Sequence, residues 1–339
     1  MTQLESDVII WIQFANGAKF TLQNGGIFLA VYWDNRRYYS LDYYLKQTYG
    51  RKMYKISLDA GLTCPNRDGT LGDRGCIFCS AGRSGDFAAD RRLSITEQIR
   101  TGKAQAAGKY SGNAYIAYFQ AYTNTYAPIS RLREIFTEAL ASPDICILDI
   151  ATRPDCLGPD VLELLRELSA IKPVWIELGL QTIHTQTAKF IRRGYELPVF
   201  EQAVLSLRAL SIPVIVHTIL GLPGEGMPHL LATVSYLNTL DIQGVKFQLL
   251  HILRGTDLAA YYREHPFPLP DMEEYFVMLD RALSTLRPDI AVHRLTGDGP
   301  KPLLVAPLWT GHKRRVLNGL HAYLKEHDIW QGKDYEKGM

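Results

Sequence analysis

Three cysteines carry the clearest chemical signal in this chain of 339 residues. Cys64, Cys76 and Cys79 lie within one stretch rich in glycine, aspartate and arginine (61–86). Two thiolates at the C-x2-C spacing of the second pair readily bind one metal centre, and a third can fold back through a glycine-containing loop. Electron-transfer clusters use four cysteines, whereas three thiolates leave one iron open to a substrate or cofactor. The spacing therefore predicts a [4Fe–4S] cluster with one open position.

Other interpretations of these cysteines remain. Three thiolates do not complete a tetrahedral zinc site, and no histidine lies between Ala60 and His184, so a zinc knuckle would need a distant fourth ligand. The three could also be ordinary buried thiols. We expect Cys146 to be structural, and we give the same role to Cys156, although its position just beyond a strand could bring it to the site.

The bulk composition is that of an ordinary globular protein. Hydrophobic residues make up 47% of the chain, and its formal net charge of +2 neither requires nor excludes a nucleic-acid partner. No apolar run reaches the roughly 20 residues that span a bilayer, and the N-terminus lacks a secretory signal pattern. Five cysteines in such a chain argue against a disulfide framework. We therefore expect a cytoplasmic protein with no membrane partner.

From residue 53 onward, short β-branched or aromatic runs alternate with helical segments, which predicts successive βα units. The expected strands are 53–58, 114–120, 145–152, 174–181, 213–220 and 244–250, and the expected helices are 94–108, 130–141, 159–170, 198–210 and 228–240. Ser94 and Glu97 form a capping-box pattern at the start of the first helix. Consecutive parallel strands need right-handed crossover helices, so six units predict an α/β fold, a partial (βα)6 barrel of the TIM type.

This interpretation divides the chain into three parts. Residues 1–36 show no sustained period and are expected to form a peripheral extension. Residues 37–255 form the barrel. Residues 256–339 contain expected helices at 271–287 and 313–327 and a proline-rich bend at 265–270, so we expect an α-rich extension packed on the barrel.

Polar residues interrupt three of the expected strands with a period of two. Glu177, Gly179 and Gln181 share one face of their strand, Lys246 and Gln248 share one face of theirs, and His217 is the polar residue of the third. Strands buried on both faces should be nearly continuously apolar, so the polar face should point into the barrel. Active sites of β/α barrels lie at the carboxyl ends of the strands, near which we find Gln120, Arg153, Gln181 and His217. Each could instead be a satisfied core polar group.

Longer motifs around these residues point to a family. The stretch that leads into the cluster loop reads Tyr54-Lys-Ile-Ser-Leu-Asp-Ala-Gly-Leu-Thr-Cys-Pro-Asn-Arg-Asp-Gly, and the stretches 151–155, 177–182, 192–195, 221–225 and 306–310 follow it. Together they resemble the YhcC-like family of radical S-adenosylmethionine (SAM) enzymes. That family is similar to the radical SAM domain of the elongator catalytic subunit and, more distantly, to oxygen-independent coproporphyrinogen oxidases. The resemblance covers residues 37–335. The first two cluster cysteines of this chain are further apart than in the common radical SAM motif.

The resemblance implies a cofactor set and site residues. A [4Fe–4S] cluster held by the three cysteines would be chelated by SAM and, when reduced, would cleave it to methionine and a 5′-deoxyadenosyl radical that abstracts hydrogen from a substrate. A reducing electron donor of the flavodoxin or ferredoxin type would supply the electron. The implied SAM contacts are Phe78 near adenine, Gln120 on the segment that approaches the amino group, Gln181, Arg193 at the carboxylate, and His217, which stands where the oxidases carry a SAM-contacting aspartate.

The substrate is not indicated by these motifs, and three functions stay open. The first is a radical SAM enzyme that acts on an unidentified substrate. The second is a tRNA- or RNA-modifying radical SAM enzyme, based on the elongator resemblance, the basic triplet Lys313-Arg314-Arg315 and 19 tyrosines that could stack on bases. The third is a non-catalytic iron–sulfur redox protein. We expect no second cluster, because no cysteine follows Cys156.

Overall fold

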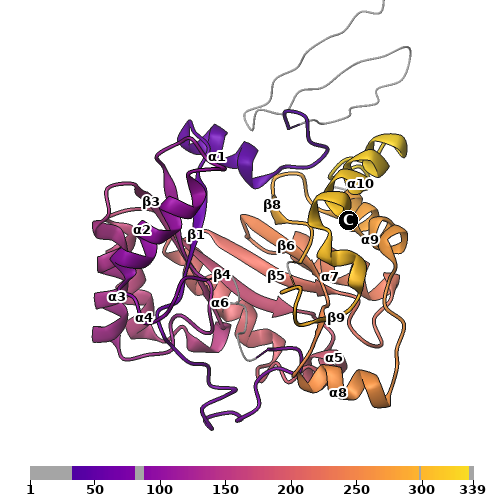
Figure 1. Cartoon of the computed structure of the whole chain (residues 1–339), viewed down its shortest axis with the longest axis horizontal. Helices are drawn as coiled ribbons and strands as arrows, with labels where there is room; N and C mark the ends of the chain where they lie inside the picture. The colour runs from indigo at the N-terminus through magenta and orange to yellow at the C-terminus, as the bar shows by residue number, and fades with distance from the viewer. Residues whose placement is uncertain (1–32, 81–87, 298, 336–339) are drawn as a thin grey trace, which may run out of the picture.

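The computed structural model describes residues 33–80, 88–297 and 299–335 (Figure 1). Most of the predicted N-terminal extension, residues 1–32, lies outside the described residues. In the described part, Trp33 is fully buried and its ring stacks on that of Tyr39 at 6.0 Å. The division of the chain at residues 36 and 255 stays a prediction.

The centre of the molecule is a curved sheet of seven parallel strands, which confirms the predicted α/β partial barrel. Its strands follow the order β1 (Tyr54–Leu58), β2 (Tyr115–Phe119), β3 (Ile145–Thr152), β4 (Val174–Gln181), β5 (Val214–Leu220), β6 (Gly244–Leu249) and β8 (Ala291–Arg294). The first six match the predicted strands to within a residue or so. The seventh, β8, was not predicted, because a four-residue segment with two apolar side chains gives no readable alternation.

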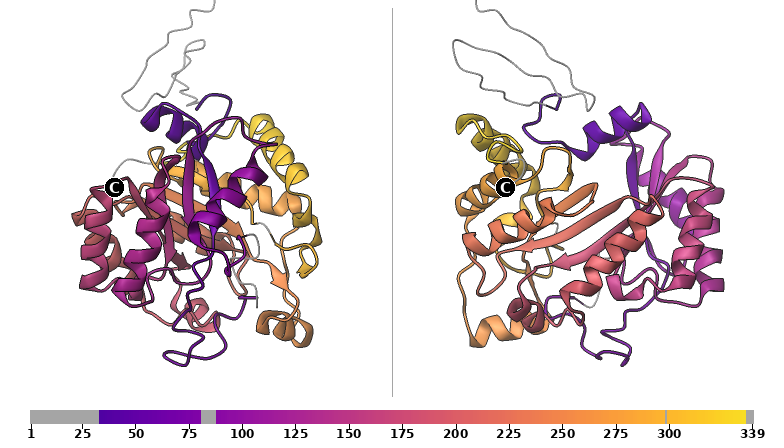
Figure 2. Two further views of the ribbon diagram at one scale, coloured as in Figure 1. Left: turned by 60° about the vertical axis from the view of Figure 1, so that its left-hand side comes forward. Right: turned by 180° about the vertical axis from the view of Figure 1, so that it is seen from behind.

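Helices cover the outer face of this sheet (Figures 1 and 2). They are α2 (Ile95–Ala106), α3 (Ile129–Ala141), α4 (Pro159–Ser169), α6 (Leu197–Ala209), α7 (Met227–Asn238) and α9 (Met272–Thr285), and α10 (Lys313–Glu326) packs on α9. Ser94 and Glu97 form the predicted capping box at α2, which satisfies backbone N–H groups at its start. Apolar helix side chains and the outward-facing strand residues form one continuous core between the two layers.

The amino-terminal end of the half barrel is closed by helix α1 (Leu41–Tyr49), which the sequence reading did not predict. Leu45 of this helix packs in a separate apolar cluster with inward-facing residues near the start of the strands, among them Ile116, Ile147 and Trp175. Because this floor is apolar and covered, access to the interior must come from the carboxyl ends of the strands or from the open side of the sheet.

The segment after β6 crosses the carboxyl edge before it returns to the sheet as β8. It contains β7 (Ile252–Leu253), α8 (Asp257–Glu264) and α9, and β7 pairs antiparallel with β9 (Leu304–Ala306). Short 3-10 turns, η2 (Pro154–Cys156) and η3 (Leu308–Gly311), follow β3 and β9. Within the described ranges, no helix has the length and apolar composition needed to cross a membrane.

Candidate functional site

The cysteine loop lies at the carboxyl edge of the sheet, near α5 (Thr185–Phe190) and α8 at the lower end of Figure 1. Side chains of the loop itself fix its shape. The amide of Asn66 donates to Cys76 Sγ at 3.5 Å and to the backbone oxygen of Arg192 at 2.8 Å. Nη2 of Arg67 donates to the backbone oxygen of Cys79 at 2.8 Å. The loop is therefore tied both to itself and to the segment after α5.

The three thiols share an electropositive environment. A hydrogen bond from the Cys79 thiol, opposed by burial and assisted by the charge of Arg153, lowers the pKa of Cys76 to about 6. The same hydrogen bond raises the pKa of Cys79 well above its ordinary value. Cys64 is close enough to act electrostatically on Cys79. Nearby cations and hydrogen-bond donors stabilise thiolates, the form of cysteine that binds metal.

The thiols fit a cluster better than a single metal ion. Among the residues that the structure describes, no three cysteine, histidine or carboxylate side chains lie close enough to surround one ion. In a cubane cluster each thiolate binds a different iron, so the sulfur atoms need not converge on one point. The donor set is compatible with a [4Fe–4S] cluster whose fourth iron is free to bind another ligand.

The interior of the half barrel contains one ionisable side chain from each of the first six strands. We call this set the ionisable layer: Lys55, Tyr118, Asp149, Glu177, His217 and Lys246. Glu177 is its centre, because it accepts hydrogen bonds from Lys55 Nζ at 2.8 Å, from Lys246 Nζ at 2.5 Å and from His217 Nε2 at 2.7 Å. Lys55 also pairs with Asp149, and Lys246 Nζ donates to Tyr118 at 3.2 Å.

Burial and neighbouring charge set the protonation of this layer. Burial alone would raise the pKa of Glu177, but the two lysine charges hold it well below its ordinary value, so this group is a carboxylate. Burial and the charge of Lys246 lower the pKa of His217 to about 4, which leaves the imidazole neutral at pH 7. Burial and the negative charge of Glu177 raise the pKa of Asp149 to about 7. The layer is a paired ionic network that its surroundings have largely desolvated.

Above the layer, Gln181 ends strand β4 in a left-handed conformation, with φ of 60°. Its side chain folds back along the strand, and its Nε2 atom occupies the space that a Cβ at Gly179 would need. Tyr195 donates to the backbone oxygen of Gly179 and lies 3.3 Å from Oε1 of Gln181. The glutamine is thus held in one position at the carboxyl end of the barrel.

Two adjacent arginines after α5 have different surroundings. Arg193 is 2% exposed and its guanidinium donates to the backbone oxygens of Leu180, Thr182 and Tyr195. These bonds use Nε and Nη1, and Nη2 has no hydrogen-bond partner among the described residues. Arg192 instead forms an ion pair with Asp257 of α8 at 2.5 Å. Of the two, Arg193 is buried, whereas Arg192 is partly exposed at the ion pair with α8.

The other residues with a predicted SAM contact lie at different depths. The carbonyl oxygen of the Gln120 side chain accepts a hydrogen bond from Ser57 at 3.1 Å. Phe78 packs with an apolar cluster at the carboxyl edge that includes Ile191 and Leu250. His217 lies deepest, since it belongs to the ionisable layer, and its Nδ1 is 3.3 Å from the amide nitrogen of Gln248. The SAM contacts of all five predicted residues stay predictions.

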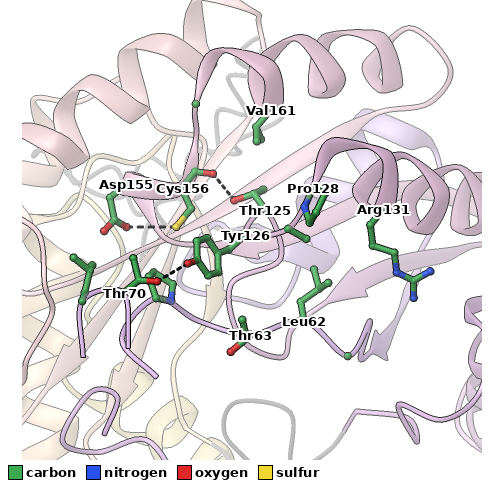
Figure 3. Close-up of a pocket in the computed structure, with 15 residues that line it drawn as sticks. Leu62, Thr63, Thr70, Thr125, Tyr126, Pro128, Arg131, Asp155, Cys156 and Val161 are labelled. Atoms are coloured by element: carbon green, nitrogen blue, oxygen red, sulfur yellow. Dashed lines mark hydrogen bonds between the residues drawn. The ribbon is translucent and has the colours of Figure 1, made fainter. Parts of the chain in front are cut away.

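A cavity of about 970 Å³ opens beside the cysteine loop (Figure 3). It lies between that loop, the segment after β2 and the start of α4, and its lining includes Thr63, Tyr126, Arg131 and Cys156. Burial and Asp155 raise the pKa of Cys156 to about 12, so its thiol stays protonated. The hydroxyl of Thr125 donates to the backbone oxygen of Cys156 at 2.7 Å. Cys146 packs against the apolar floor cluster, its thiol donates to the backbone oxygen of Asp144 at 3.8 Å, and it does not line this cavity.

The sequence reading missed several residues that the structure brings to the site. Lys55 and Asp149 complete the ionisable layer, and a charged residue within an otherwise apolar strand was the available signal. Asn66 and Arg67 stand two and three residues after Cys64, but nothing in their spacing indicates which backbone groups they bind. The role of Asn66 depends on its hydrogen bond to a segment more than 100 residues away in the chain.

Known proteins resemble this chain in sequence and in fold. The model of the Radical SAM superfamily matches residues 69–237, and that of the radical SAM C-terminal domain matches residues 242–326. The protein YtqA of Bacillus subtilis is 40% identical over 89% of this chain and 94% of its own length, and the protein YhcC of Escherichia coli is 35% identical over 84% and 91%. The solved structure of Elp3 from Methanocaldococcus infernus, with an N-terminal deletion, has a TM-score of 0.64 at 15% identity and covers 82% of this chain and 64% of that one.

Proposed function

The chain belongs to the radical SAM superfamily, and we propose that Cys64, Cys76 and Cys79 hold the [4Fe–4S] cluster with which it acts on a substrate inside the half barrel. It is a radical SAM enzyme whose cofactors are this cluster and SAM. When bound, the reduced cluster and SAM supply a 5′-deoxyadenosyl radical for hydrogen abstraction. The observation that carries the assignment is the group of three thiols in one electropositive loop at the carboxyl edge of the strands.

The protein contributes position and a shielded interior. Asn66 and Arg67 hold the loop, and the amide that reaches Cys76 stabilises its thiolate. Gln181, fixed by Tyr195 and by the space at Gly179, presents its amide to the upper interior as a contact for SAM. A preorganised group loses little freedom when the ligand binds, so such contacts are effective.

Arg193 is the proposed partner of the SAM carboxylate. Its Nη2 group carries two N–H donors that the described residues leave unused. Three backbone carbonyls fix the rest of the guanidinium, so the free donors have one direction. Phe78, Gln120 and His217 complete the proposed set.

We place the enzyme in the cytoplasm with a flavodoxin- or ferredoxin-type reductant. Its five cysteines carry no disulfide, as expected in a reducing compartment. Thr63 and Pro65, the neighbours of Cys64 in the chain, line the open cavity of about 970 Å³, and we place the approach of the donor on this side of the cluster loop.

A second candidate substrate is RNA. Lys313, Arg314 and Arg315 are exposed at the start of α10, where the helix dipole disfavours positive charge and where no acidic residue occupies the first turn. A basic group kept in an unfavourable place is consistent with a phosphate-binding role. Nucleoside analysis of RNA from a deletion strain tests this candidate. If every modified nucleoside is still present in that strain, RNA is excluded as the substrate.

The experiment that tests the main proposal is reductive cleavage of SAM. The protein, reconstituted anaerobically with iron and sulfide and reduced with dithionite, should convert SAM to methionine and 5′-deoxyadenosine, both measured by mass spectrometry. A protein that holds four irons but forms no 5′-deoxyadenosine would be a redox protein instead. Stoichiometric zinc without labile sulfide would overturn the cluster assignment.

A further inference from the structure

Strand β8 contains a bulge where it faces the ionisable layer. Val292 pairs with Val245 and Arg294 pairs with Lys246, so His293 is an additional residue between two paired ones. A bulge sets two residues against one on the partner strand and can re-aim a side chain. It brings two consecutive side chains of β8 to the interior.

Contacts of both residues support this arrangement. The ring of His293 lies 5.6 Å from that of Trp175, an inward-facing residue of the floor cluster. The charge of Arg294 acts on Lys246, His217 and Tyr118, all members of the ionisable layer. Arg294 therefore lies at the same depth as the layer, although its own strand was recruited from the C-terminal region.

The charges around Arg294 do not balance. Lys55 and Lys246 are paired with the two carboxylates of the layer, Asp149 and Glu177. Arg294 is half-buried, and it forms no ion pair with an acidic side chain in the described ranges. Burial lowers the pKa of Lys246 to about 7, close to the raised pKa of Asp149. Whether these two groups are both charged or both neutral, the cationic side chains Lys55, Lys246 and Arg294 exceed the anionic ones by one positive charge.

The layer also exposes its groups unequally. The side chains of Asp149 and Glu177 are 0% exposed, whereas those of Lys55 and His217 keep 20% and 19%. The carboxylates are sealed beneath the cations, and the accessible side of the layer is cationic or neutral. An incoming group meets positive potential in a partly desolvated setting, which favours an anion.

We propose that Arg294 binds an anionic group of the substrate, a phosphate or a carboxylate, at the accessible side of the ionisable layer. This inference rests on the proposed function only in that the ligand is taken to be the substrate. The guanidinium suits either oxyanion, because its planar N–H groups can form two parallel charge-assisted hydrogen bonds. The substrate is thereby assigned to a class of anionic molecules whose reactive carbon lies toward the carboxyl edge.

Anion titration tests this proposal without knowledge of the substrate. Sodium phosphate and, separately, sodium acetate are titrated calorimetrically at low ionic strength into the full-length, cluster-reconstituted protein saturated with SAM. At least one anion should bind, and Arg294→Gln should weaken it by about tenfold or more, as expected for a lost hydrogen bond to a charged group. Arg281→Gln, which alters a surface arginine paired with Asp334, should bind like the wild type.

The outcomes separate the sources of the anion and the two proposals. Binding of phosphate alone indicates a phosphorylated substrate, and binding of acetate alone indicates a carboxylate. No binding of either anion, or equal binding by Arg294→Gln, overturns the proposal, as does a loss of SAM affinity in that variant. If the wild-type protein binds the anion but does not cleave SAM, the proposed function fails and the anion site stands.

Stability gives a second, independent readout. Because the charge on Arg294 adds to those of Lys55 and Lys246, its neutralisation should not lower the melting temperature of the anion-free protein. A variant that fails to fold, or melts well below the wild type, would show that Arg294 balances the layer structurally and would overturn the proposal.

Discussion

Gly179 leaves the space that the side-chain amide of Gln181 occupies, two residues further along the same strand. A Cβ at position 179 would overlap Nε2 of the glutamine, so Gly179→Ala should push the amide away from its position beside Tyr195. We expect SAM affinity to fall by about tenfold, the effect of one lost hydrogen bond to a charged ligand. SAM titration of the reduced protein, followed by the EPR signal of the cluster, measures this.

The control for that variant is Gly158→Ala. No atom lies within 4 Å of a Cβ built at Gly158, and its φ of −66° suits any residue. If both variants bind SAM like the wild type, the amide of Gln181 does not contact the cofactor.

Loss of one proposed ligand should remove the cluster. Cys76→Ala deletes a thiolate that the amide of Asn66 and the Cys79 thiol both support. We expect the reconstituted variant to lose the iron content of about four and the brown absorbance at roughly 400 nm of a thiolate-held [4Fe–4S] cluster. Cys146→Ser, which changes a thiol beside the apolar floor, should keep both. Equal loss in two folded variants would refute the ligand assignment.

Arg193 and its neighbour should differ in their effect on SAM. Arg193→Ala would leave three buried backbone oxygens without donors, so the conservative Arg193→Lys is the better test. The lysine keeps the positive charge but lacks the planar, two-pronged N–H donors of the guanidinium. We expect the SAM affinity of the variant to fall by about ten- to hundredfold while its iron content stays that of the wild type. Arg192→Lys, at an ion pair with Asp257 outside the interior, should change affinity little. The reverse pattern would exchange the roles of the two arginines.

Glu177 should be the most stability-sensitive residue of the ionisable layer. Glu177→Gln leaves Lys55, Lys246 and His217 with Asp149 as the remaining carboxylate, and one buried positive charge loses its partner. Removal of one partner from a buried ion pair costs about 3–5 kcal/mol in the free energy of unfolding. Urea denaturation measures this cost.

Two comparisons define that result. The double variant Glu177→Gln with Lys246→Met should recover part of the loss, because the unpaired charge is gone. Glu163→Gln, which breaks an exposed pair with Arg166, should cost less than about 1 kcal/mol. Similar values for the buried and the exposed variant would mean that the layer is well solvated.

His217 should contribute to the acid sensitivity of the fold. Burial and Lys246 lower its pKa from 6.5 to about 4 in the folded protein. Between these values the unfolded chain binds a proton that the folded protein does not, so stability rises with pH. This contribution is complete above pH 6.5 and is lost as the pH falls toward 4. His217→Asn should therefore flatten the slope of unfolding free energy against pH in that window by up to about 1.4 kcal/mol per pH unit.

The wild-type curve alone does not isolate this residue, because Asp149, with a raised pKa of about 7, acts in the opposite direction over the same range. The difference between variant and wild type is the quantity to measure, by urea denaturation from pH 4.5 to 7.5. A slope that the substitution leaves unchanged would show that His217 titrates normally in the folded state.

Local patterns in the sequence were sufficient for the first six strands of the sheet and their crossover helices. Each of the first six strands combines an apolar face with a crossover helix, and hydrophobic burial with obligatory backbone pairing leaves little freedom in how such units assemble. The cysteine spacing was equally informative, because Cys64, Cys76 and Cys79 belong to one loop and metal ligation depends on a few residue types at short range. The period-two polar residues Glu177 and Lys246 also indicated an inward-facing polar surface.

Tertiary structure decided which charges meet. Lys55 and Glu177 are 122 residues apart in the chain, and they form an ion pair only because the parallel register brings β1 and β4 to the same depth. The bulge that directs Arg294 inward belongs to a four-residue strand with no readable periodicity. Periodicity reports which face a side chain occupies, whereas partners across a barrel depend on strand order, tilt and register. Those properties arise from packing the whole chain at once, which is why the ionisable layer and its excess positive charge appear only in the folded protein.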